Sequence, residues 1–503
     1  MLARKLFWCI ELRYLSTRRA HAQIAQINPQ LVRGFSGLRE RLGADDRAHA
    51  HIESVELFEG CLCHCAQFAH MHVVIIGAGW AGVAAAVHAV EQGARVTVIE
   101  ERPYIGGRAR SFPDRTTDTI IDNGQHIMMG CYREVLHVLQ TLGTADLLER
   151  QTALRVGFID AGGRQDLLDA SAVPGKLGVA LGILRLRQLP LRDRLAALRF
   201  AVRLTINRID AHGLTCSELF TAYRQPPLLV ERLWEPIVLA TMNAPIHQAS
   251  AELFCTVMRL AFLGGPEDSQ LLIPRGGLSD LLEPFPAWIA ERGGEVRTSV
   301  AVERLTIRDN RVESVMLSTG EEITDVDAVI SCVPQRAVMR LWTASHQPGV
   351  ELAEPAHSPI VSVYLWYRTQ WMSADLTATL GTVTQWVFNK QRTAPGLVAL
   401  TISAASDLAN QEREAIVSAC DAELRMLFPE QLRGVDLVHS QVIKEKTATP
   451  IFTPMANTER LASDAFGVDN LRIAGDWVQT GLPATLEGAA FSGVLAASDL
   501  LSA

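Results

Sequence analysis

The segment that most constrains the fold of this chain lies at residues 71–101 and reads MHVVIIGAGWAGVAAAVHAVEQGARVTVIEE. Two short apolar runs, at 73–76 and 96–99, flank an alanine-rich stretch of helical length. Short apolar runs bounded by glycine favour buried strands, and the stretch between them favours a helix. We therefore predict a strand, a helix and a second strand that together form one parallel β-α-β unit.

Three glycines, Gly77, Gly79 and Gly82, stand between the first strand and the helix. The first permits a tight turn, the second lets the backbone approach a pyrophosphate, and the third lets the helix pack close to the sheet. Glu100 ends the second strand, where an acid accepts hydrogen bonds from ribose hydroxyls and disfavours a 2′-phosphate. A glycine-rich turn in an ordinary α/β unit is the alternative. Because the strand, the glycines, the helix, the second strand and the terminal acid follow one another in the expected order and spacing, we predict a site for an ADP-containing dinucleotide.

The composition excludes several classes of protein. The chain has 503 residues, enough for about two to four domains, and is 48% hydrophobic. No run approaches the ~20 apolar residues that cross a bilayer, which argues against an integral membrane protein. The net charge of −8 gives no general attraction to nucleic acid, so we predict no nucleic-acid partner. The nine cysteines show no disulfide spacing pattern, which fits a reducing compartment.

Residues 1–70 differ in character from the rest of the chain. Their apolar run at 6–10 is too short for the core of a signal peptide. A cluster with C-x-C-x-C spacing ends at Cys65, but it lacks the paired spacings of zinc sites, and we predict no metal. The first strand of such folds usually opens the chain, so we interpret Met71 as the natural start and residues 1–70 as upstream sequence or a disordered leader. A protein beginning at Met71 that fails to fold or bind its cofactor would contradict this interpretation.

Two polar turns follow the β-α-β unit. Gly106-Gly107-Arg108 combines backbone freedom with a guanidinium, which suits a diphosphate, although a surface turn with a solvated arginine is the alternative. The sequence DNGQH, from Asp122 to His126, follows a short strand and can bring backbone and amide donors against a flat ring. Alternatively, its acid caps the next segment and its histidine is a satisfied core residue.

These motifs resemble a known superfamily. The sequences VVIIGAGWAGVAAA, VIEERPYIGGRARS and DNGQHIMMGCY are similar to those of the FAD-dependent phytoene desaturase and amine oxidase superfamily. The DNGQH variant, with LWEPIVLATMNAP at 233–245 and AGDWVQTGLPATLEGAAFSG at 474–493, resembles the hydroxysqualene dehydroxylase branch. The resemblance extends from Met71 to the C-terminus and leaves out residues 1–70.

The resemblance implies a cofactor, FAD, and further residues that hold it. It implies that Gly475 and Asp476 contact the pyrophosphate and ribityl chain, and that the backbone around Val302 contacts the adenine. A helix expected to begin near Thr485 suits the electron-rich edge of the flavin. A second G-x-G-x-x-G is absent, which favours one FAD over an additional NAD(P)H domain. The residues assigned to FAD are Gly77, Gly79, Gly82, Glu100, Gly106, Gly107, Arg108, Gln125, Val302, Gly475, Asp476, Leu486 and Glu487.

The predicted fold is α/β, with a Rossmann-like FAD-binding domain of glutathione-reductase type and an inserted, mixed α+β substrate domain. Strands are expected near 295–298, 301–307, 312–317, 328–332, 360–367, 386–388 and 396–402, with a hairpin turn at Asp309-Asn310 and a helix at 412–426. The FAD domain is assigned to residues 71–155, 274–345 and 463–503. The substrate domain is assigned to residues 156–273 and 346–462.

The region 156–272 is predicted to be mostly helical. Its part at 176–210 carries eight basic residues against two aspartates, threaded with apolar residues. A basic amphipathic helix of this kind can lie on an anionic bilayer, whereas a helix pair with one buried and one solvated face is the alternative. We favour the membrane interpretation and predict a cytoplasmic protein that is peripherally associated with the inner face of the cytoplasmic membrane. Pro236 is expected to end a helix.

The resemblance implies a reductive reaction on an apolar isoprenoid, in which hydride from reduced FAD replaces an allylic hydroxyl and gives squalene for hopanoid synthesis. Hydroxide leaves poorly, so an acid should protonate it. The candidates are Asp122, His126, Glu235 and Glu487, and we select Asp122 and His126. The electron donor is not predicted.

Three other functions fit the same fold. A phytoene-type desaturase would use FAD in the oxidative direction. An amine oxidase is expected to place an aromatic pair against the flavin, and no suitable pair is identifiable. A prenyl-lipid escort, similar to the Rab escort family, would need no flavin, and the intact FAD motifs argue against it.

Overall fold

The computed structural model describes residues 71–347 and 355–501. The fold and the site belong to one compact unit, which contains His72–Val90 and the described residues from Val96 onward. The expectations for residues 1–70, including the cluster at Cys61, Cys63 and Cys65, lie outside the described residues.

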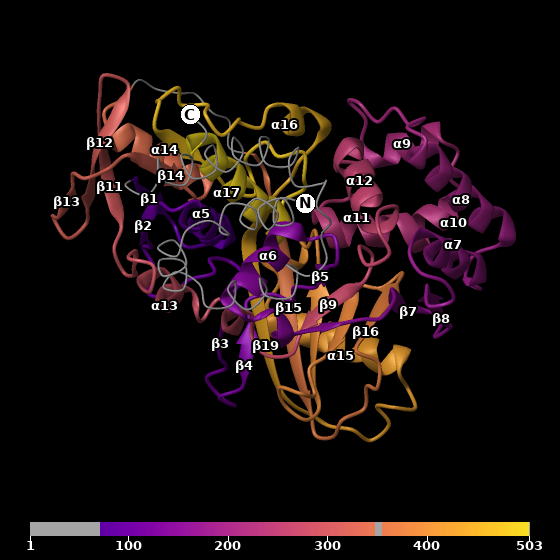
Figure 1. Cartoon of the computed structure of the whole chain (residues 1–503). Helices are drawn as coiled ribbons and strands as arrows, with labels where there is room; N and C mark the ends of the chain where they lie inside the picture. The colour runs from indigo at the N-terminus through magenta and orange to yellow at the C-terminus, as the bar shows by residue number, and fades with distance from the viewer. Residues whose placement is uncertain (1–70, 348–354, 502–503) are drawn as a thin grey trace, which may run out of the picture. The chain divides into compact units, whose positions relative to one another are not determined.

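A five-stranded sheet carries the predicted β-α-β unit (Figure 1). Its strand order is β10 (Glu295–Arg297), β2 (Arg95–Ile99), β1 (His72–Ile76), β14 (Ala328–Ser331) and β20 (Leu471–Ile473). The pairs β10/β2, β1/β14 and β14/β20 are parallel. Strands β1 and β2 are almost wholly buried, as their continuous apolar runs predict.

Helices pack around this sheet or on one another beside it. They are α5 (Trp80–Glu91), α6 (Arg133–Leu142), α13 (Phe285–Ala290), α14 (Gln335–Ala344) and α17 (Leu486–Leu501). A Cβ added at Gly493 of α17 would lie 2.0 Å from the Ala81 carbonyl oxygen of α5, so these two helices approach closely. An antiparallel sheet of β11 (Val302–Arg308), β12 (Arg311–Leu317) and β13 (Glu322–Ile323) lies between β10 and β14 in sequence. The predicted turn at Asp309-Asn310 joins its first two strands, and both residues have positive φ.

A second large sheet has seven strands. Their order is β19 (Leu437–Pro450), β15 (His357–Tyr367), β18 (Leu397–Ile402), β17 (Trp386–Asn389), β16 (Leu376–Leu380), β7 (Arg155–Asp160) and β8 (Gln165–Asp169). One face packs on α15 (Arg413–Leu427), through alternate residues of β15 such as Val361, Val363 and Leu365. The other face carries Tyr364 and Trp366 into the main hydrophobic cluster. Figure 1 shows α15 beside this sheet.

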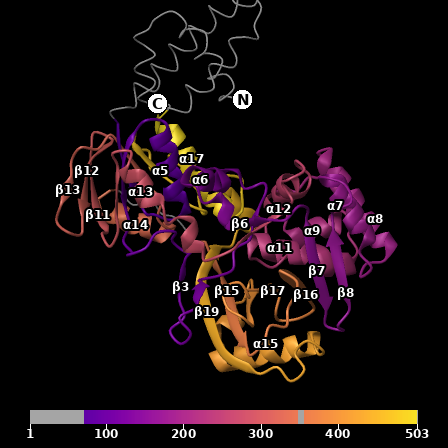
Figure 2. The ribbon, with the colours of Figure 1, turned by 60° about the horizontal axis from the view of Figure 1, so that its bottom comes forward.

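The region predicted to be mostly helical contains a helical group (Figure 2). Its helices are α7 (Lys176–Arg185), α8 (Leu191–Thr205), α9 (Cys216–Ala222), α10 (Pro227–Leu229), α11 (Glu235–Met242) and α12 (Ala251–Val257), with π-helical turns at Val230–Trp234 and Met258–Phe262. The prediction missed the β7–β8 hairpin with which the region begins. Trp234 and Phe254 are core residues of this group.

Two local predictions for this region are corrected. Pro236 does not end a helix, because α10, the π-helical turn and α11 follow one another and proline takes a first-turn position in α11. A missing N–H is tolerated at such a position. The basic stretch contains two helices in place of the single helix expected, since α7 ends at Arg185 and Pro190 precedes α8.

Short elements connect the large sheets. Strands β3 (Ser111–Pro113) and β4 (Ile120–Asp122) form a hairpin, and β5 (Met128–Met129), β9 (Leu271–Pro274) and β6 (Leu148–Arg150) form a small antiparallel sheet. Helix α16 (Pro454–Thr458) and 3-10 turns at Ala145–Leu147, Leu278–Leu281 and Leu408–Asn410 complete the described elements. No helix within the described ranges is long and apolar enough to cross a membrane.

Candidate cofactor and active site

The glycine turn after β1 has the geometry that its sequence predicts. Gly77 has a φ of +99°, and its N–H donates to the Ile99 carbonyl of β2 at 2.7 Å. A Cβ at Gly82 would lie 1.9 Å from the Gly77 carbonyl oxygen, so only glycine fits there. A Cβ at Gly79, in contrast, would meet no atom within 4 Å. The turn is therefore open at Gly79, beside the N-terminus of α5.

Glu100 stands at the carboxyl end of β2, next to this turn. Its carboxylate accepts hydrogen bonds from the Ala78 N–H at 2.7 Å and from the Arg102 N–H at 2.8 Å. Each oxygen keeps a further lone pair, which can accept from a ribose hydroxyl. The backbone of Val300 donates to the Glu100 carbonyl at 3.0 Å, so the segment leading into Val302 lies against the same turn.

The Gly106-Gly107-Arg108 segment folds onto the first turn. The Gly106 N–H donates to the Ala78 carbonyl at 2.8 Å, and a Cβ at Gly107 would lie 3.3 Å from the Gly79 Cα. Arg108 is an ion-pair partner of Asp476, at 2.7 Å, and also donates to the Ala448 carbonyl at 2.5 Å. The Asp476 carboxylate raises the pKa of Arg108 above its ordinary value. The side chain is thus 42% exposed, but its guanidinium is paired with a protein carboxylate.

The second cofactor segment follows β20. Gly475 has a φ of +147°, and its N–H donates to the Ser492 hydroxyl of α17 at 2.8 Å. A Cβ at Gly475 would approach the Trp477 Nε1 to 2.6 Å, which excludes a side chain. Strands β1, β14 and β20 are parallel and in register, so the turns after Ile76 and Ile473 lie at the same sheet edge.

Sequence reasoning missed one buried residue of this segment, Arg460. Its guanidinium donates to the carbonyls of Leu482, at 2.7 Å, and Asp476, at 3.3 Å, as well as to Val478. It also lies 4.2 Å over the Phe452 ring. Burial lowers the pKa of Arg460 to about 10. Nothing in the local sequence pattern around residue 460 marks it, because its hydrogen-bond partners lie 16 or more residues away.

Asp122, at the end of β4, is surrounded by hydrogen-bond donors. Its Oδ1 accepts from the Ser111 hydroxyl at 2.8 Å and the Leu278 N–H at 3.0 Å. Its Oδ2 accepts from Lys390 Nζ at 3.3 Å and the Gln125 amide at 3.4 Å. These four hydrogen bonds engage both carboxylate oxygens and anchor the turn. The role of Asp122 as a proton donor stays a prediction.

His126 ends the same turn in a different environment. Its Nδ1 donates to the Gly124 carbonyl at 2.9 Å, which leaves Nε2 without a hydrogen bond among the described residues. Burial lowers the pKa of His126 below its ordinary value. Of the two predicted catalytic residues, His126 alone has an atom available to a reacting group.

The other two candidate acids occupy separate places. The Glu487 carboxylate accepts from the backbone N–H groups of Glu134, at 3.0 Å, and Val135, at 3.1 Å, at the N-terminus of α6. Burial raises its pKa, but its oxygens are engaged in capping that helix. Glu235 begins α11. Burial is the main cause that raises the pKa of Glu235, and the negative charge of the nearby Glu231 is the second.

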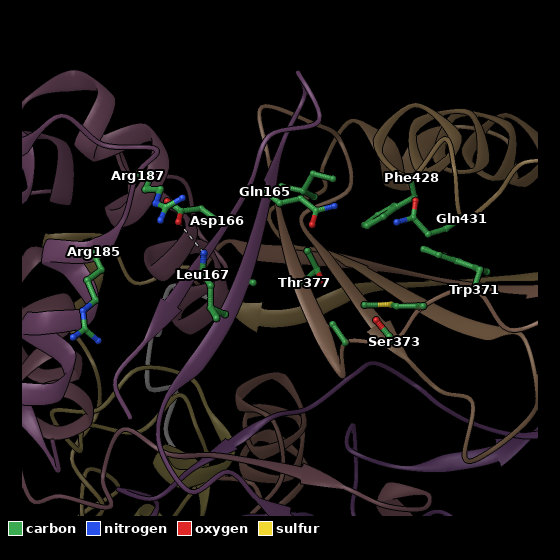
Figure 3. A pocket seen from close by; sticks show the side chains of 14 residues that line it. Gln165, Asp166, Leu167, Arg185, Arg187, Trp371, Ser373, Thr377, Phe428 and Gln431 are labelled. Carbon is green, nitrogen blue, oxygen red and sulfur yellow. Dashed lines mark hydrogen bonds between the residues drawn. The ribbon is translucent and has the colours of Figure 1, made fainter. Parts of the chain in front are cut away.

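A cavity of about 580 Å³ lies beneath the β7–β8 hairpin (Figure 3). Arg185 and Arg187 line one end, and Trp371 and Phe428 line the other. Its apolar residues Ile159, Met372 and Phe428 belong to the cluster under α15. The cavity is therefore on the face of the sheet opposite to Tyr364, and we do not assign it to the active site.

The fold and this sheet edge define a class of protein, the dinucleotide-binding α/β proteins. Residues 80–501 match the family model described as flavin containing amine oxidoreductase. A hydroxysqualene dehydroxylase from Rhodopseudomonas palustris is 31% identical over 452 residues, which cover 86% of this chain and 98% of the relative. A 15-cis-phytoene desaturase from Glycine max is 22% identical, with 86% of this chain and 79% of the relative covered.

A solved structure of an oxidoreductase from Methanosarcina mazei matches with a TM-score of 0.65 at 16% identity, and covers 84% of this chain and 99% of its own. The chain thus belongs to the flavin containing amine oxidoreductases and, among them, to the hydroxysqualene dehydroxylase family. It is a flavin-dependent oxidoreductase with FAD as its cofactor.

The residues present fit FAD. The open space at Gly79, the helix N-terminus beside it and the free lone pairs of Glu100 suit an ADP moiety. The structure brings the segments at 77–82, 106–108 and 475–476 together, and the DNGQH turn joins them because Asn123 donates to the Arg108 carbonyl at 3.2 Å. Leu486 and Glu487 begin α17, and Glu487 points to α6. Individual contacts with FAD remain predictions.

Proposed function

We propose that this protein is a hydroxysqualene dehydroxylase, which converts hydroxysqualene to squalene in hopanoid synthesis. The observation that carries the proposal is the 31% identity to a hydroxysqualene dehydroxylase across 98% of that relative. The identity to a phytoene desaturase is lower, at 22%, and does not favour the oxidative alternative.

In the proposed reaction a hydroxyl leaves as water and a hydride takes its place. FAD, when bound and reduced, supplies the hydride. The Nε2–H of protonated His126 gives its proton to the departing hydroxyl, and the neutral imidazole is held by the Nδ1 hydrogen bond to Gly124. The hydrogen bonds of the Asp122 side chain fix the turn. The neighbouring apolar cluster, which includes Tyr364 and Trp366, excludes water from the reacting carbon.

The proposal is tested with photoreduced enzyme and hydroxysqualene in the absence of oxygen. Reoxidation of the flavin should accompany the appearance of squalene, identified by its mass. Oxidised enzyme is mixed with phytoene in parallel. Flavin reduction and a desaturated product in that second mixture, with no squalene in the first, would instead identify a desaturase.

The same proposal includes the type of nucleotide domain. The order β10-β2-β1-β14-β20 with the antiparallel sheet β11–β13 between β10 and β14 in sequence supports the glutathione-reductase type. The division into an FAD domain and an inserted substrate domain, at the predicted boundaries, is part of this proposal.

The proposal also includes contact with the inner face of the cytoplasmic membrane, where an apolar substrate collects. Helix α8 supports it, because this helix has two apolar stripes. Phe200 and Leu204 lie on the buried stripe. A second stripe faces outward and contains the exposed residues Leu191, Leu195, Val202 and Ile206, with exposed Arg192, Arg199 and Arg203 beside it. An exposed apolar stripe flanked by arginine suits an anionic lipid surface.

A further inference from the structure

The hydroxyl of Tyr364 on β15 makes every hydrogen bond that a phenol can make. It donates to the Asp122 carbonyl at 2.8 Å, and it accepts from the Asp122 N–H at 3.1 Å and the Gln125 amide at 2.6 Å. A phenol has one donor and two acceptor lone pairs, so it is saturated. Tyr364 is fully buried, which makes each of these bonds costly to lose.

Lys390 provides a second support for the turn. Its side chain is 12% exposed and comes from the residue after β17, and its Nζ lies 3.3 Å from Asp122 Oδ2. The same carboxylate oxygen accepts from the Gln125 amide at 3.4 Å. The carboxylate must stay an acceptor to satisfy the lysine and the amide at once. Tyr364 lies on a strand of the seven-stranded sheet, and Lys390 directly follows another strand of the same sheet. Both residues therefore hold the DNGQH turn, which is distant from them in sequence.

These contacts decide which way the Gln125 amide points. Its NH₂ group donates to both the Tyr364 hydroxyl and the Asp122 carboxylate. Rotation of the amide would bring its carbonyl oxygen against the carboxylate, and two acceptors repel each other. The Gln125 carbonyl oxygen is left with no hydrogen bond to any described residue, on a turn whose residues 123–126 are only half-buried.

We propose that Tyr364 and Lys390 are positioning residues that fix Gln125 with its carbonyl oxygen, a hydrogen-bond acceptor, directed to the flavin. This inference rests on the flavin site and specifies the contribution of one side chain to it. Reduction adds an N–H donor to the flavin ring, so a fixed acceptor favours the reduced cofactor. Gln125 then raises the midpoint potential of the bound FAD. Tyr364 contributes by holding the Gln125 amide in the orientation that this effect requires.

The test is the substitution Tyr364→Phe, measured in the FAD-loaded protein without substrate. We expect a more negative midpoint potential and a changed visible spectrum of the flavin, because the amide loses its nearest acceptor and reorients. Tyr367→Phe is the matched control. Tyr367 lies on the same strand, but it faces the α15 side and donates to Asp421 at 2.7 Å. Its loss should leave the flavin spectrum and potential unchanged.

Gln125→Met provides an independent variant if Tyr364→Phe does not fold. It removes the carbonyl oxygen and leaves Tyr364 and Asp122 in place, and its potential should shift in the same negative direction. Wild-type spectrum and potential in Gln125→Met would overturn the inference. The midpoint potential is measured without hydroxysqualene, so this test is independent of the proposed function. The proposed function fails if the wild-type protein does not convert hydroxysqualene.

Discussion

At the scale of single residues, Gly79 and Gly82 show how one sequence motif combines two different requirements. The helix reaches its neighbouring turn only because position 82 has no side chain, and the nearest obstacle is backbone. Position 79 has room for a methyl group in the protein itself. Packing within the protein therefore explains the glycine at position 82 but not the glycine at position 79. A ligand that occupies the open space beside Gly79 would explain the second one.

Alanine substitutions should separate these requirements. Gly82→Ala should destabilise the protein by about 1–3 kcal/mol or more, since overpacking against backbone cannot relax easily. Gly79→Ala should leave the unfolding midpoint of the FAD-free protein unchanged while weakening FAD binding about tenfold or more, or about 1.4 kcal/mol. Urea unfolding and flavin fluorescence titration measure the two effects. Equal loss of stability in both variants would contradict a cofactor-specific role for Gly79.

The environment of His126 leads to a prediction about pH. Burial lowers the pKa of this histidine below its ordinary value, and the protonated form is the acid. The protonated fraction is high below that pKa and falls as the pH rises through it. The rate at which substrate reoxidises the reduced flavin should therefore decline from acidic to neutral pH.

His126→Gln should remove this pH dependence and slow the rate by about 10²–10⁴. His247→Gln, at an exposed histidine, serves as the control and should keep the wild-type pH profile. A profile that is flat in the wild-type protein would exclude His126 as the proton donor.

At the scale of secondary-structure elements, α6 obtains its N-terminal cap from a distant helix. The residue that precedes it, Tyr132, gives no side-chain cap. The Glu487 carboxylate of α17 accepts the Glu134 and Val135 N–H groups in its place, from more than 350 residues away. An anion at a helix N-terminus also interacts favourably with the helix dipole. The contact therefore fixes the position of α17 relative to α6.

Glu487→Ala should lower the free energy of unfolding by about 2 kcal/mol or more, because two backbone donors lose their partner. Glu487→Gln keeps one acceptor oxygen and should show a smaller loss. Glu430→Ala removes an exposed glutamate that pairs with Arg433, and should change stability little. Chemical denaturation compares the three. An unchanged free energy of unfolding in Glu487→Ala would show that water replaces the carboxylate at this helix end.

Local patterns in the sequence predicted the elements well where the requirement is itself local. The buried strands β1 and β2, the turn at Asp309-Asn310 and the strand that contains Tyr364 follow from apolar runs and turn residues. The environment of Asp122 could not be predicted in this way, because three of its four donors lie 11, 156 and 268 positions from it. Asp122 acquires these contacts only after tertiary folding has brought those donors to it.

At the scale of the whole molecule, the charge of the chain is unevenly distributed. The chain carries a net charge of −8, yet the exposed side of α8 carries arginines around an apolar stripe. Long-range repulsion from an anionic bilayer and local attraction by this helix thus oppose each other. Salt weakens both but leaves the apolar contact.

This balance predicts how the protein binds vesicles. Binding should be stronger to vesicles with anionic lipid than to neutral ones, and Leu195→Ser with Val202→Ser should reduce it about tenfold while the fold is kept. Phe428 and Trp371, around the separate cavity, provide no comparable exposed stripe, so Gln431→Ala there is the control. Co-sedimentation measures the binding. Equal binding by the double variant would assign membrane contact to another surface.

The ion pair between Arg108 and Asp476 joins positions 368 residues apart. During synthesis at about 5–20 residues per second, the ribosome produces the glycine turn long before it produces Asp476. At that rate, roughly 20–70 seconds pass between the synthesis of the glycine turn and the synthesis of the second segment of the cofactor site. We expect FAD to be captured after translation of this segment, so that a shortage of the cofactor leaves a nearly complete chain exposed to proteases.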